Sequence, residues 1–273
     1  MDKKVILKKQ DLTYLKWAHG RSSSGTAGTF LKAQSVVSGE KVYYKLSNFD
    51  SEKGIVGHEC VNEIIVDRLL TILGIEHLSY QLIHADVEIE GRIYETWLCA
   101  SKDFKQQGES KSALDSYYQI NRQSDETRYD FCINKGWKKY IDAMLAVDYL
   151  ILNRDRHGAN IEVLRNGKTR TVRMAPMFDH GLSFLCSCYS EDEIEKFDIT
   201  GERPCQNFIG SRSVYENLKL ITDKANVFVR PLTLQDKDIL FADLTGILSK
   251  THLNKIWDML WLRWCEYEKL CNL

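Results

Sequence analysis

The sequence predicts an α+β protein with two lobes, a β-rich N-terminal lobe that contains one helix and a mainly helical C-terminal lobe. Three observations favour this class. Residues 1–104 alternate in the manner of strands, residues 105–273 carry apolar positions at helical spacing, and 273 residues suffice for two lobes. We place the boundary between residues 104 and 105, where β-branched and aromatic residues give way to polar ones.

The N-terminal lobe is expected to consist of strands around a single helix. The helix is predicted from His58 to Leu73, because apolar residues recur there every three or four positions, and Gly74 ends the run as a left-handed C-cap does. The strands are rich in β-branched and aromatic residues and are separated by turn signals. They cover residues 4–8, 29–37, 41–47, 78–89 and 93–100.

The C-terminal lobe is expected to begin with a polar surface excursion over residues 108–130 and a largely buried helix over 137–152. Asn166-Gly167 predicts a hairpin that joins the strand IEVL to the strand TRTVRM. Residues 232–248 and 252–270 place leucines and tryptophans at helical spacing, which is typical of a packed core face, and we assign them no chemistry.

Composition and charge exclude several classes of function. The net charge of -1 gives no overall attraction to nucleic acid or to an anionic membrane. No apolar run approaches the roughly 20 residues that a membrane span needs, and the N-terminus lacks the apolar region of a signal peptide. The eight cysteines include no CxxC pair, which favours reduced thiols. We therefore expect a cytoplasmic protein, with release as a secreted effector as the alternative.

The chemistry is concentrated in residues 151–184, where a buried helix leads into polar groups. Asp155 and Asn160 lie in one loop, and the hairpin that follows returns the chain so that Asp179 can approach them. Carboxylate and amide oxygens are the hard ligands that Mg²⁺ prefers, so Asn160 and Asp179 are candidate metal ligands. Asp155 can orient or deprotonate an attacking hydroxyl. This division of roles is typical of phosphoryl transfer.

The N-terminal lobe contains matching candidates for phosphate binding. The glycines and small hydroxyl residues between Gly20 and Thr29 allow backbone amides to approach phosphate oxygens. Strand alternation lets Lys45 point into the cleft, and a site of this kind pairs its lysine with a helix glutamate. Glu59 and Glu63 are both placed for that pairing, and we favour Glu63 because it adjoins the apolar helix face.

These motifs resemble those of the HipA-like kinases, atypical bacterial serine/threonine kinases with a distant protein-kinase fold. NRDRHGANIEVL is similar to the family's catalytic loop, FDHGLSF to its metal-binding segment, and ECVNEIIVDRLLTILGI to its helix with an NE pair. The resemblance implies an ATP- and magnesium-dependent kinase. It makes Asp155 the catalytic base, Asn160 and Asp179 the metal ligands, Lys45 the nucleotide-binding lysine held by Glu63, and His157 a residue near the nucleotide.

The resemblance also implies further contacts and partners. The backbones of Cys99, Ala100 and Ser101 would form the hinge that meets adenine. The glycine-rich loop would contact the phosphates, and its serines are candidate autophosphorylation sites. Loop residues expected at the nucleotide are Ser23, Ser24, Gly25, Thr26, Ala27 and Gly28, and the candidate phosphosites are Ser22, Ser23 and Ser24.

Compact members of the group, such as HipT-like toxins and CtkA-like kinases, resemble this chain most, because Lys45 comes too early for the extra N-terminal subdomain of full-length HipA toxins. An aminoacyl-tRNA synthetase substrate and an antitoxin partner are implied by the family. No direct contact with nucleic acid or membrane is expected. Two alternatives remain open: a phosphoinositide or small-molecule kinase that shares the DRHxxN pattern, and a nucleotide-binding pseudokinase. The acidic residues between 183 and 212 disfavour a membrane substrate.

Overall fold

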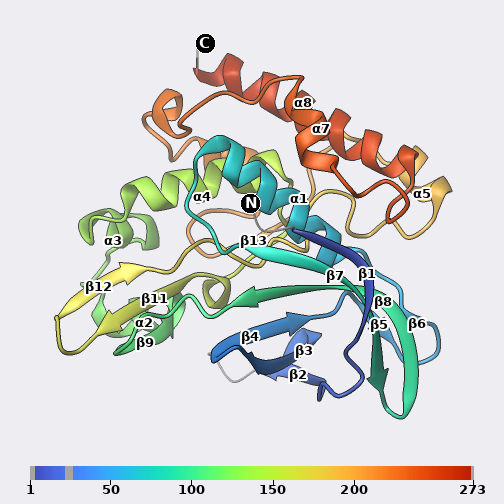
Figure 1. Ribbon diagram of the computed structural model, residues 1–273. Helices are drawn as coiled ribbons and strands as arrows, with labels where there is room; N and C mark the ends of the chain where they lie inside the picture. The colour runs from blue at the N-terminus through green and yellow to red at the C-terminus, as the bar shows by residue number, and fades with distance from the viewer. Residues whose placement is uncertain (1–3, 22–26, 272–273) are drawn as a thin grey trace.

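The computed structural model describes residues 4–21 and 27–271. Its largest sheet has six strands in the order β1-β7-β8-β4-β3-β2 and forms the lower part of the molecule in Figure 1. All pairs in this sheet are antiparallel except β1 with β7. The strands are β1 (Val5–Asp11), β2 (Ala18–Arg21), β3 (Ala27–Val37), β4 (Glu40–Lys45), β7 (Tyr80–Ile89) and β8 (Arg92–Lys102).

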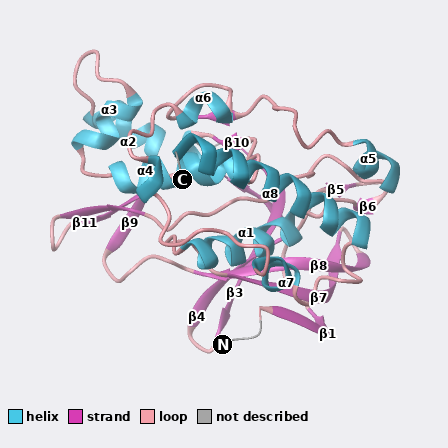
Figure 2. Ribbon diagram, turned by 90° about the horizontal axis from the view of Figure 1, so that it is seen from above, coloured by secondary structure: helices cyan, strands magenta, loops and turns pink. Residues whose placement is uncertain are grey.

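Helix α1 (Glu59–Leu73) is the helix predicted between the strands, and it lies between the sheet and the helices α7 (Asp236–Phe241) and α8 (Lys250–Cys271) (Figures 1 and 2). It is buried on nearly all sides, which explains its dense apolar pattern. Gly74 caps its C-terminus at φ 73°, in the left-handed conformation that glycine adopts without steric cost. The helix therefore packs firmly against the face of the sheet that contains β8.

The remainder of the chain is mainly helical, with small sheets inserted. Its helices are α2 (Leu114–Asn121), α3 (Arg128–Asn134), α4 (Lys138–Leu150), α5 (Glu191–Lys196) and α6 (Val214–Leu218), with 3₁₀ turns η1 (Gly158–Asn160) and η2 (Lys224–Asn226). One sheet of three strands has the order β12-β11-β9. The strands outside the large sheet are β5 (Phe49–Asp50), β6 (Gly54–Ile55), β9 (Glu109–Ala113), β10 (Asp155–Arg156), β11 (Glu162–Asn166), β12 (Thr171–Met174) and β13 (Gln206–Asn207). The mixed α and β composition is confirmed.

Two segments differ from the expectations. The polar stretch 108–130 contains β9, α2 and the start of α3, because Leu114, Tyr117 and Tyr118 turn inward and are buried. Residues 232–248 form only the six-residue helix α7. The chain leaves the helix there, since Asp243 and Gly246 have φ values of 61° and 94° in the left-handed region.

Two apolar cores lie on opposite faces of the large sheet. The larger core joins the inner face to α1, α4 and α8, and the smaller core packs against the outer face around Tyr44, Leu46 and Ile83. The larger core therefore links residues that are far apart in sequence and anchors α1 from both sides. Among residues 4–21 and 27–271, no helix combines the length and apolarity needed to cross a bilayer. The eight cysteines are free thiols.

Candidate active site

Three charged side chains from separate elements meet behind the large sheet. Lys45 ends strand β4, Glu63 lies in the middle of α1, and Asp179 follows strand β12 by a short loop. The Nζ atom of Lys45 is 2.9 Å from Oε1 of Glu63 and 2.5 Å from Oδ1 of Asp179. The Lys45 and Glu63 side chains are 10% and 0% exposed, whereas that of Asp179 is 22% exposed. The cluster is thus buried but open on the Asp179 side.

The charges in this cluster stabilise one another. Burial alone would lower the pKa of Lys45, but the carboxylates of Asp179 and Glu63 outweigh burial and raise that pKa well above its ordinary value. Burial would likewise raise the pKa of Asp179, and the Lys45 ammonium overcomes it, so the pKa of Asp179 is held below its usual range. Lys45 and Asp179 are therefore both charged at neutral pH.

The structure brings Glu63, and not Glu59, to Lys45. One turn earlier on α1, Oε2 of Glu59 accepts a hydrogen bond from the backbone N–H of Asn48 at 3.0 Å. Burial raises the pKa of Glu59. Both glutamates are buried on the same helix, so the position of β4 decides which of them meets the lysine.

The segment that carries Asp179 is fixed against α1. Asp179 has φ 59°, a left-handed conformation that aspartate tolerates better than most residues. The other Glu63 oxygen accepts from the backbone N–H of His180 at 2.9 Å, and Nδ2 of Asn62 donates to the carbonyls of Gly181 and Ser183. A Cβ on Gly181 would lie only 3.0 Å from Cβ of Glu59, a tight contact that a glycine avoids.

The loop that carries Asp155 and Asn160 is held from beneath by a buried arginine. Arg156 is 2% exposed, donates to both carboxylate oxygens of Asp148, and reaches the carbonyls of Phe178 at 2.9 Å and Asn160 at 3.3 Å. Arg156 thereby ties the loop to the segment before Asp179. Asn160 donates from Nδ2 to the Asp155 carbonyl at 2.9 Å, and this places its amide oxygen away from that bond.

Asp155 lines a surface hollow of about 500 Å³, which we call the acceptor hollow. Its lining residues are Arg154, Asp155, His157, Leu182 and Gln206. Burial raises the pKa of Asp155, the nearby charge of Asp179 adds to the rise, and the positive charge of His157 opposes it. The His157 Nε2 atom is 3.6 Å from the nearer Asp155 oxygen. A carboxylate with a raised pKa is a better proton acceptor than an ordinary one.

A cavity of about 530 Å³ lies between the sheet and the Asp179 segment. Five lysines line it against three acidic residues, and Lys45, Lys102 and Lys111 are ion-paired. Lys16 and Lys32 add further positive charge, so the cavity favours an anionic ligand. Phe104 and Phe178 also line it and stack with their ring centroids 5.8 Å apart, which provides an apolar surface for a flat ring. The lysines are Lys16, Lys32, Lys45, Lys102 and Lys111, and the acids are Asp103, Glu162 and Asp179.

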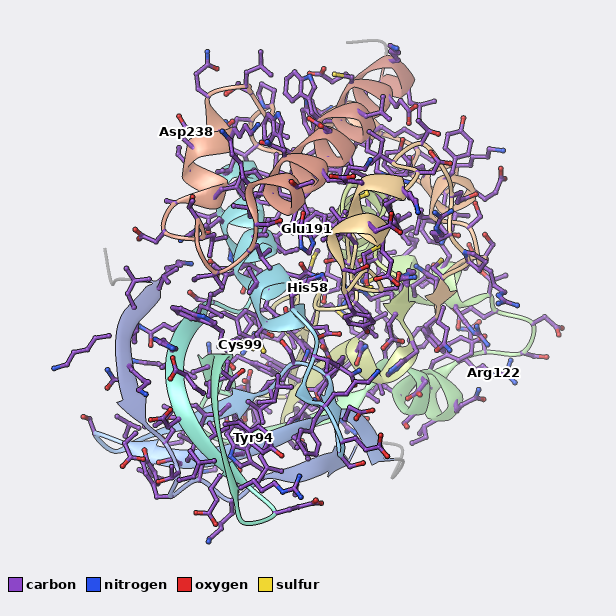
Figure 3. The ribbon with its side chains drawn as sticks, turned by 90° about the vertical axis from the view of Figure 1, so that its right-hand side faces the viewer. His58, Tyr94, Cys99, Arg122, Glu191 and Asp238 are labelled. Atoms are coloured by element: carbon purple, nitrogen blue, oxygen red, sulfur yellow. The ribbon has the colours of Figure 1, made fainter. Side chains whose placement is uncertain are left out.

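The predicted nucleotide residues occupy different places around this cavity. Lys45, Cys99, Ser101 and Asp179 line it, whereas His157 lines the acceptor hollow instead. Ala100 points to the opposite face of the sheet and belongs to the smaller core. In Figure 3, Cys99 lies in the sheet below His58, which precedes α1.

The residues expected to form the hinge lie inside the large sheet. Cys99, Ala100 and Ser101 lie inside β8 and pair with both β4 and β7, so their backbone groups serve the sheet. The chain leaves the sheet after Lys102, and Asp103 and Phe104 come next at the cavity. Ala27 and Gly28 begin strand β3, whereas Ser22, Ser23, Ser24, Gly25 and Thr26 lie outside the described residues.

Sequence reasoning missed four contributors to the site: Asn62, Phe104, Arg156 and Lys32. Lys32 lies opposite Lys45 in the β3–β4 pairing, lines the cavity and helps to lower the pKa of Asp179. Arg156 stands inside the quoted DRH motif and Asn62 inside the NE pair, so both carried a local signal. The contact between Phe104 and Phe178 joins residues far apart in sequence and had none.

Comparison with known proteins gives the fold but no sequence relative. No protein-family model and no curated protein matches the chain. The structure is similar to the crystal structure of a Helicobacter pylori proinflammatory kinase, CtkA, with a TM-score of 0.59 and 16% identity over 96% of this chain and 98% of that one. A weaker likeness, with a TM-score of 0.45 and 13% identity, is to HipA of a Shewanella oneidensis toxin–antitoxin system, in complex with HipB and operator DNA. It covers 93% of this chain and 66% of that one.

The likeness to CtkA extends over nearly the whole of both chains, so it concerns the complete architecture and not one motif. The resemblance to HipA-like kinases, drawn from the catalytic-loop and metal-segment motifs, is therefore confirmed at the level of the fold. The chain has the fold of the CtkA kinase.

Proposed function

We propose that this protein is an ATP- and magnesium-dependent kinase that transfers the γ-phosphoryl group to a serine or threonine hydroxyl of a protein. The observation that carries the proposal is the Lys45–Glu63–Asp179 cluster, of which Lys45 and Asp179 line the lysine-rich cavity. Asp155 accepts a hydrogen bond from Asn160 and lies near enough to Asp179 for that charge to raise the pKa of Asp155. The CtkA-like fold supports it. We further propose that the sheet-rich residues 1–104 and the helical residues 105–273 act as the two lobes of the kinase.

The cavity fits a nucleoside triphosphate in chemistry and in size. The stacked rings of Phe104 and Phe178 offer a surface for the base, and Lys45 with Lys32 offers positive charge for the phosphates. Glu63 holds Lys45 in place through a fully buried carboxylate, so the ammonium is positioned before the ligand arrives. Catalysis of phosphoryl transfer depends mostly on such positioning and charge neutralisation.

The residues expected to bind magnesium also fit that ion. Asp179 has an ionised carboxylate that faces the cavity, and Asn160 has an amide oxygen turned away from its own hydrogen bond. The described residues contain no group of three or more His, Cys, Asp or Glu side chains that could hold a metal by themselves. Two protein oxygens plus phosphate and water oxygens are the usual arrangement for Mg²⁺. The ion, when bound, supplies neutralisation of phosphate charge.

Asp155 is proposed as the proton acceptor. Its carboxylate lines the acceptor hollow, while Asp179 lines the cavity of about 530 Å³, which we call the nucleotide cavity. An acceptor hydroxyl in this hollow would give its proton to Asp155 as its oxygen attacks the γ-phosphorus. The bond from that phosphorus to the β–γ bridging oxygen would break, and ADP would leave. Burial of Asp155 raises its pKa and so strengthens it as a base, while the side chain is still 27% exposed and accessible.

Finer assignments from the family resemblance stay predictions. These are autophosphorylation at Ser22, Ser23 or Ser24, a role as a toxin with an antitoxin partner, an aminoacyl-tRNA synthetase as substrate, and a cytoplasmic location. The three serines precede strand β3, which borders the nucleotide cavity through Lys32 and Ala33. A phosphate added there would bring about two negative charges toward the lysines of that cavity.

The experiment that tests the function is incubation of the full chain with γ-labelled ATP and magnesium, followed by intact mass measurement and phosphosite mapping. Asp155→Asn and Asp179→Asn are the matched variants. We expect label in the wild type only, with ATP binding retained by Asp155→Asn and weakened in Asp179→Asn when magnesium is present. If Asp155→Asn is labelled as strongly as the wild type, Asp155 is not the catalytic base. Absence of ATP binding by the wild type would refute the kinase.

A further inference from the structure

A further hollow, distinct from the nucleotide cavity, adjoins the acceptor hollow and shares His157 and Gln206 with it. It has a volume of about 510 Å³ and shares no lining residue with the nucleotide cavity. We name it the arginine hollow. Its lining residues are Arg128, His157, Gly158, Cys205, Gln206, Asn207, Phe208 and Arg212.

The arginine hollow is positively charged and contains no carboxylate. Arg128 is held over the Phe208 ring at 4.6 Å and donates one N–H to the Phe208 carbonyl at 3.0 Å, which leaves other guanidinium donors available. Neither Arg128 nor Arg212 forms an ion pair with any residue in the described ranges 4–21 and 27–271. Two unpaired arginines around one hollow favour an anionic ligand.

Acidic residues near this hollow are occupied elsewhere. Glu126, two residues before Arg128, accepts from Nδ2 of Asn134 and from the backbone N–H of Gln123. Glu202 accepts from the Ser213 hydroxyl at 2.6 Å and from the N–H of Tyr215 at 3.0 Å. Asp115, which packs against Gly158, accepts from the backbone N–H and the hydroxyl of Ser116. Among the described residues, none of these three carboxylates forms an ion pair with Arg128 or Arg212.

The arginine hollow is fixed relative to the proposed base. Strand β13 pairs in parallel with β10, which contains Asp155 itself, and the N–H of Gln206 donates to the Arg154 carbonyl at 2.8 Å. The Phe208 N–H then donates to the Arg156 carbonyl at 2.9 Å. A chain segment that presents its hydroxyl to Asp155 and runs past His157 would reach the hollow after roughly two to four residues, at about 3.3 Å per extended residue.

We propose that the arginine hollow binds an anionic side chain of the substrate, a carboxylate or a phosphate, roughly two to four residues from the accepting hydroxyl. The inference rests on the proposed kinase function and specifies its substrate class. Arg212 and Arg128 act as specificity-determining residues, since they contact the flanking side chain and not the reacting atoms. Charge-assisted hydrogen bonds to guanidinium supply the selectivity.

The test uses the full chain, γ-labelled ATP with magnesium, and an array of serine peptides in which one flanking position at a time is Asp, phosphoserine, Asn or Lys. We expect about tenfold higher kcat/KM for the peptide with Asp or phosphoserine at one position within that range than for its Asn counterpart. The Asp and phosphoserine arms distinguish the two anions. The preference should weaken as salt is raised, because the contacts are partly exposed.

Arg212→Glu should abolish this preference or turn it toward Lys, while ATP affinity stays unchanged. The matched control is Arg92→Glu, an exposed arginine at the tip of the β7–β8 hairpin, which should keep the wild-type preference. If peptides are labelled but no acidic peptide is favoured, or if Arg212→Glu retains the preference, the inference fails and the kinase stands. Loss of ATP binding by the wild type would refute the kinase itself.

Discussion

The charged cluster of Lys45, Glu63 and Asp179 and the loop that carries Asp155 and His157 lie side by side but are built differently. In the cluster, the Glu63 carboxylate is fully buried and makes one hydrogen bond to each of two partners, Lys45 and the His180 backbone. In the loop, the Asp155 and His157 side chains are 27% and 39% exposed and their closest approach is 3.6 Å. The first region is fixed, and the second is open.

Because of this difference, substitutions in the two regions should affect folding stability and reaction rate differently. A buried charge that loses its partner is costly to the folded state, because water cannot replace the lost contact. A partly exposed carboxylate that has no ion-pair partner of opposite fixed charge contributes less to folding than a buried ion pair. We therefore expect substitutions in the cluster to lower stability and activity together, and substitutions in the loop to lower activity while leaving stability nearly unchanged.

The largest effect is expected from Asp155→Asn. Removal of a positioned base should lower kcat by about 10²- to 10⁴-fold, while the melting temperature and the ATP dissociation constant stay near wild-type values. Single-turnover transfer from labelled ATP, thermal melting and equilibrium binding measure the three quantities. A large loss of melting temperature in this variant would contradict the proposed contrast between the two regions.

The pH dependence of kcat in the wild type provides a second check on the same residue. Because burial raises the pKa of Asp155, the rate should fall, as the medium is acidified, at a pH above the ordinary aspartate value of 3.8. The acidic limb reports protonation of the base, and it should be absent from the residual activity of Asp155→Asn. An acidic limb of the same midpoint in both proteins would assign it to another group.

The next effect in size is expected from Glu63→Gln. This change leaves the Lys45 ammonium buried with Asp179 as its single acidic partner and should lower the free energy of unfolding by about 3 kcal/mol, together with phosphoryl transfer. Denaturant titration and the labelling assay measure the two losses. The matched control is Glu59→Gln on the same helix, whose carboxamide oxygen can still accept from the Asn48 N–H. Equal losses in both variants would show that stability and activity depend on a buried glutamate at either position and not on the contact with Lys45.

A smaller effect concerns the anchoring of α1 to α8. His58 precedes α1 and His252 lies on α8, and their rings meet edge to face with centroids 4.5 Å apart. Burial lowers the pKa of His58 to about 3 and that of His252 to about 4. Figure 3 shows His58 next to the helix that carries Glu191, whose charge partly opposes the shift of His252.

These shifts make stability pH-dependent with a defined sign. Above pH 6.5 both histidines are neutral in the folded and unfolded states. Between pH 6.5 and about 4 the unfolded chain binds protons that the folded chain refuses, so the free energy of unfolding falls as pH falls. His252→Gln should flatten this slope and recover on the order of 2 kcal/mol at the acidic end. An unchanged slope in denaturant titrations across this pH range would contradict the assignment.

The smallest effect is expected from His157→Gln. The side chain lines the acceptor hollow and not the nucleotide cavity, so the KM for ATP should stay unchanged while kcat changes by only about two- to fivefold. Loss of the histidine's positive charge should move the acidic limb of kcat slightly upward, since that charge lowers the pKa of Asp155. A selective rise in the KM for ATP would instead show that His157 contacts the nucleotide.

Local patterns in the sequence predicted most of the elements that carry the site. The three- and four-residue spacing located α1 to within one residue of its start, and Gly74 marked its end. Alternation placed Lys45 on the inner face of its strand, where Cys99 pairs with it. The positions of Asp155 and Asn160 in one loop followed from the helix that precedes them. Each of these predictions depends on neighbours within about one turn or one strand.

The tertiary structure decided the contacts between candidates. Glu59 and Glu63 share one helix and the sequence favoured Glu63, and the structure brings Glu63 to Lys45 while Glu59 accepts from the Asn48 N–H. Strand β8 has partners in both β4 and β7 as far as Ser101, so Cys99, Ala100 and Ser101 lie within the sheet. Long-range pairing and burial determine these features, and a local sequence pattern contains neither, so the sequence by itself determined the parts of the site and the fold determined their contacts.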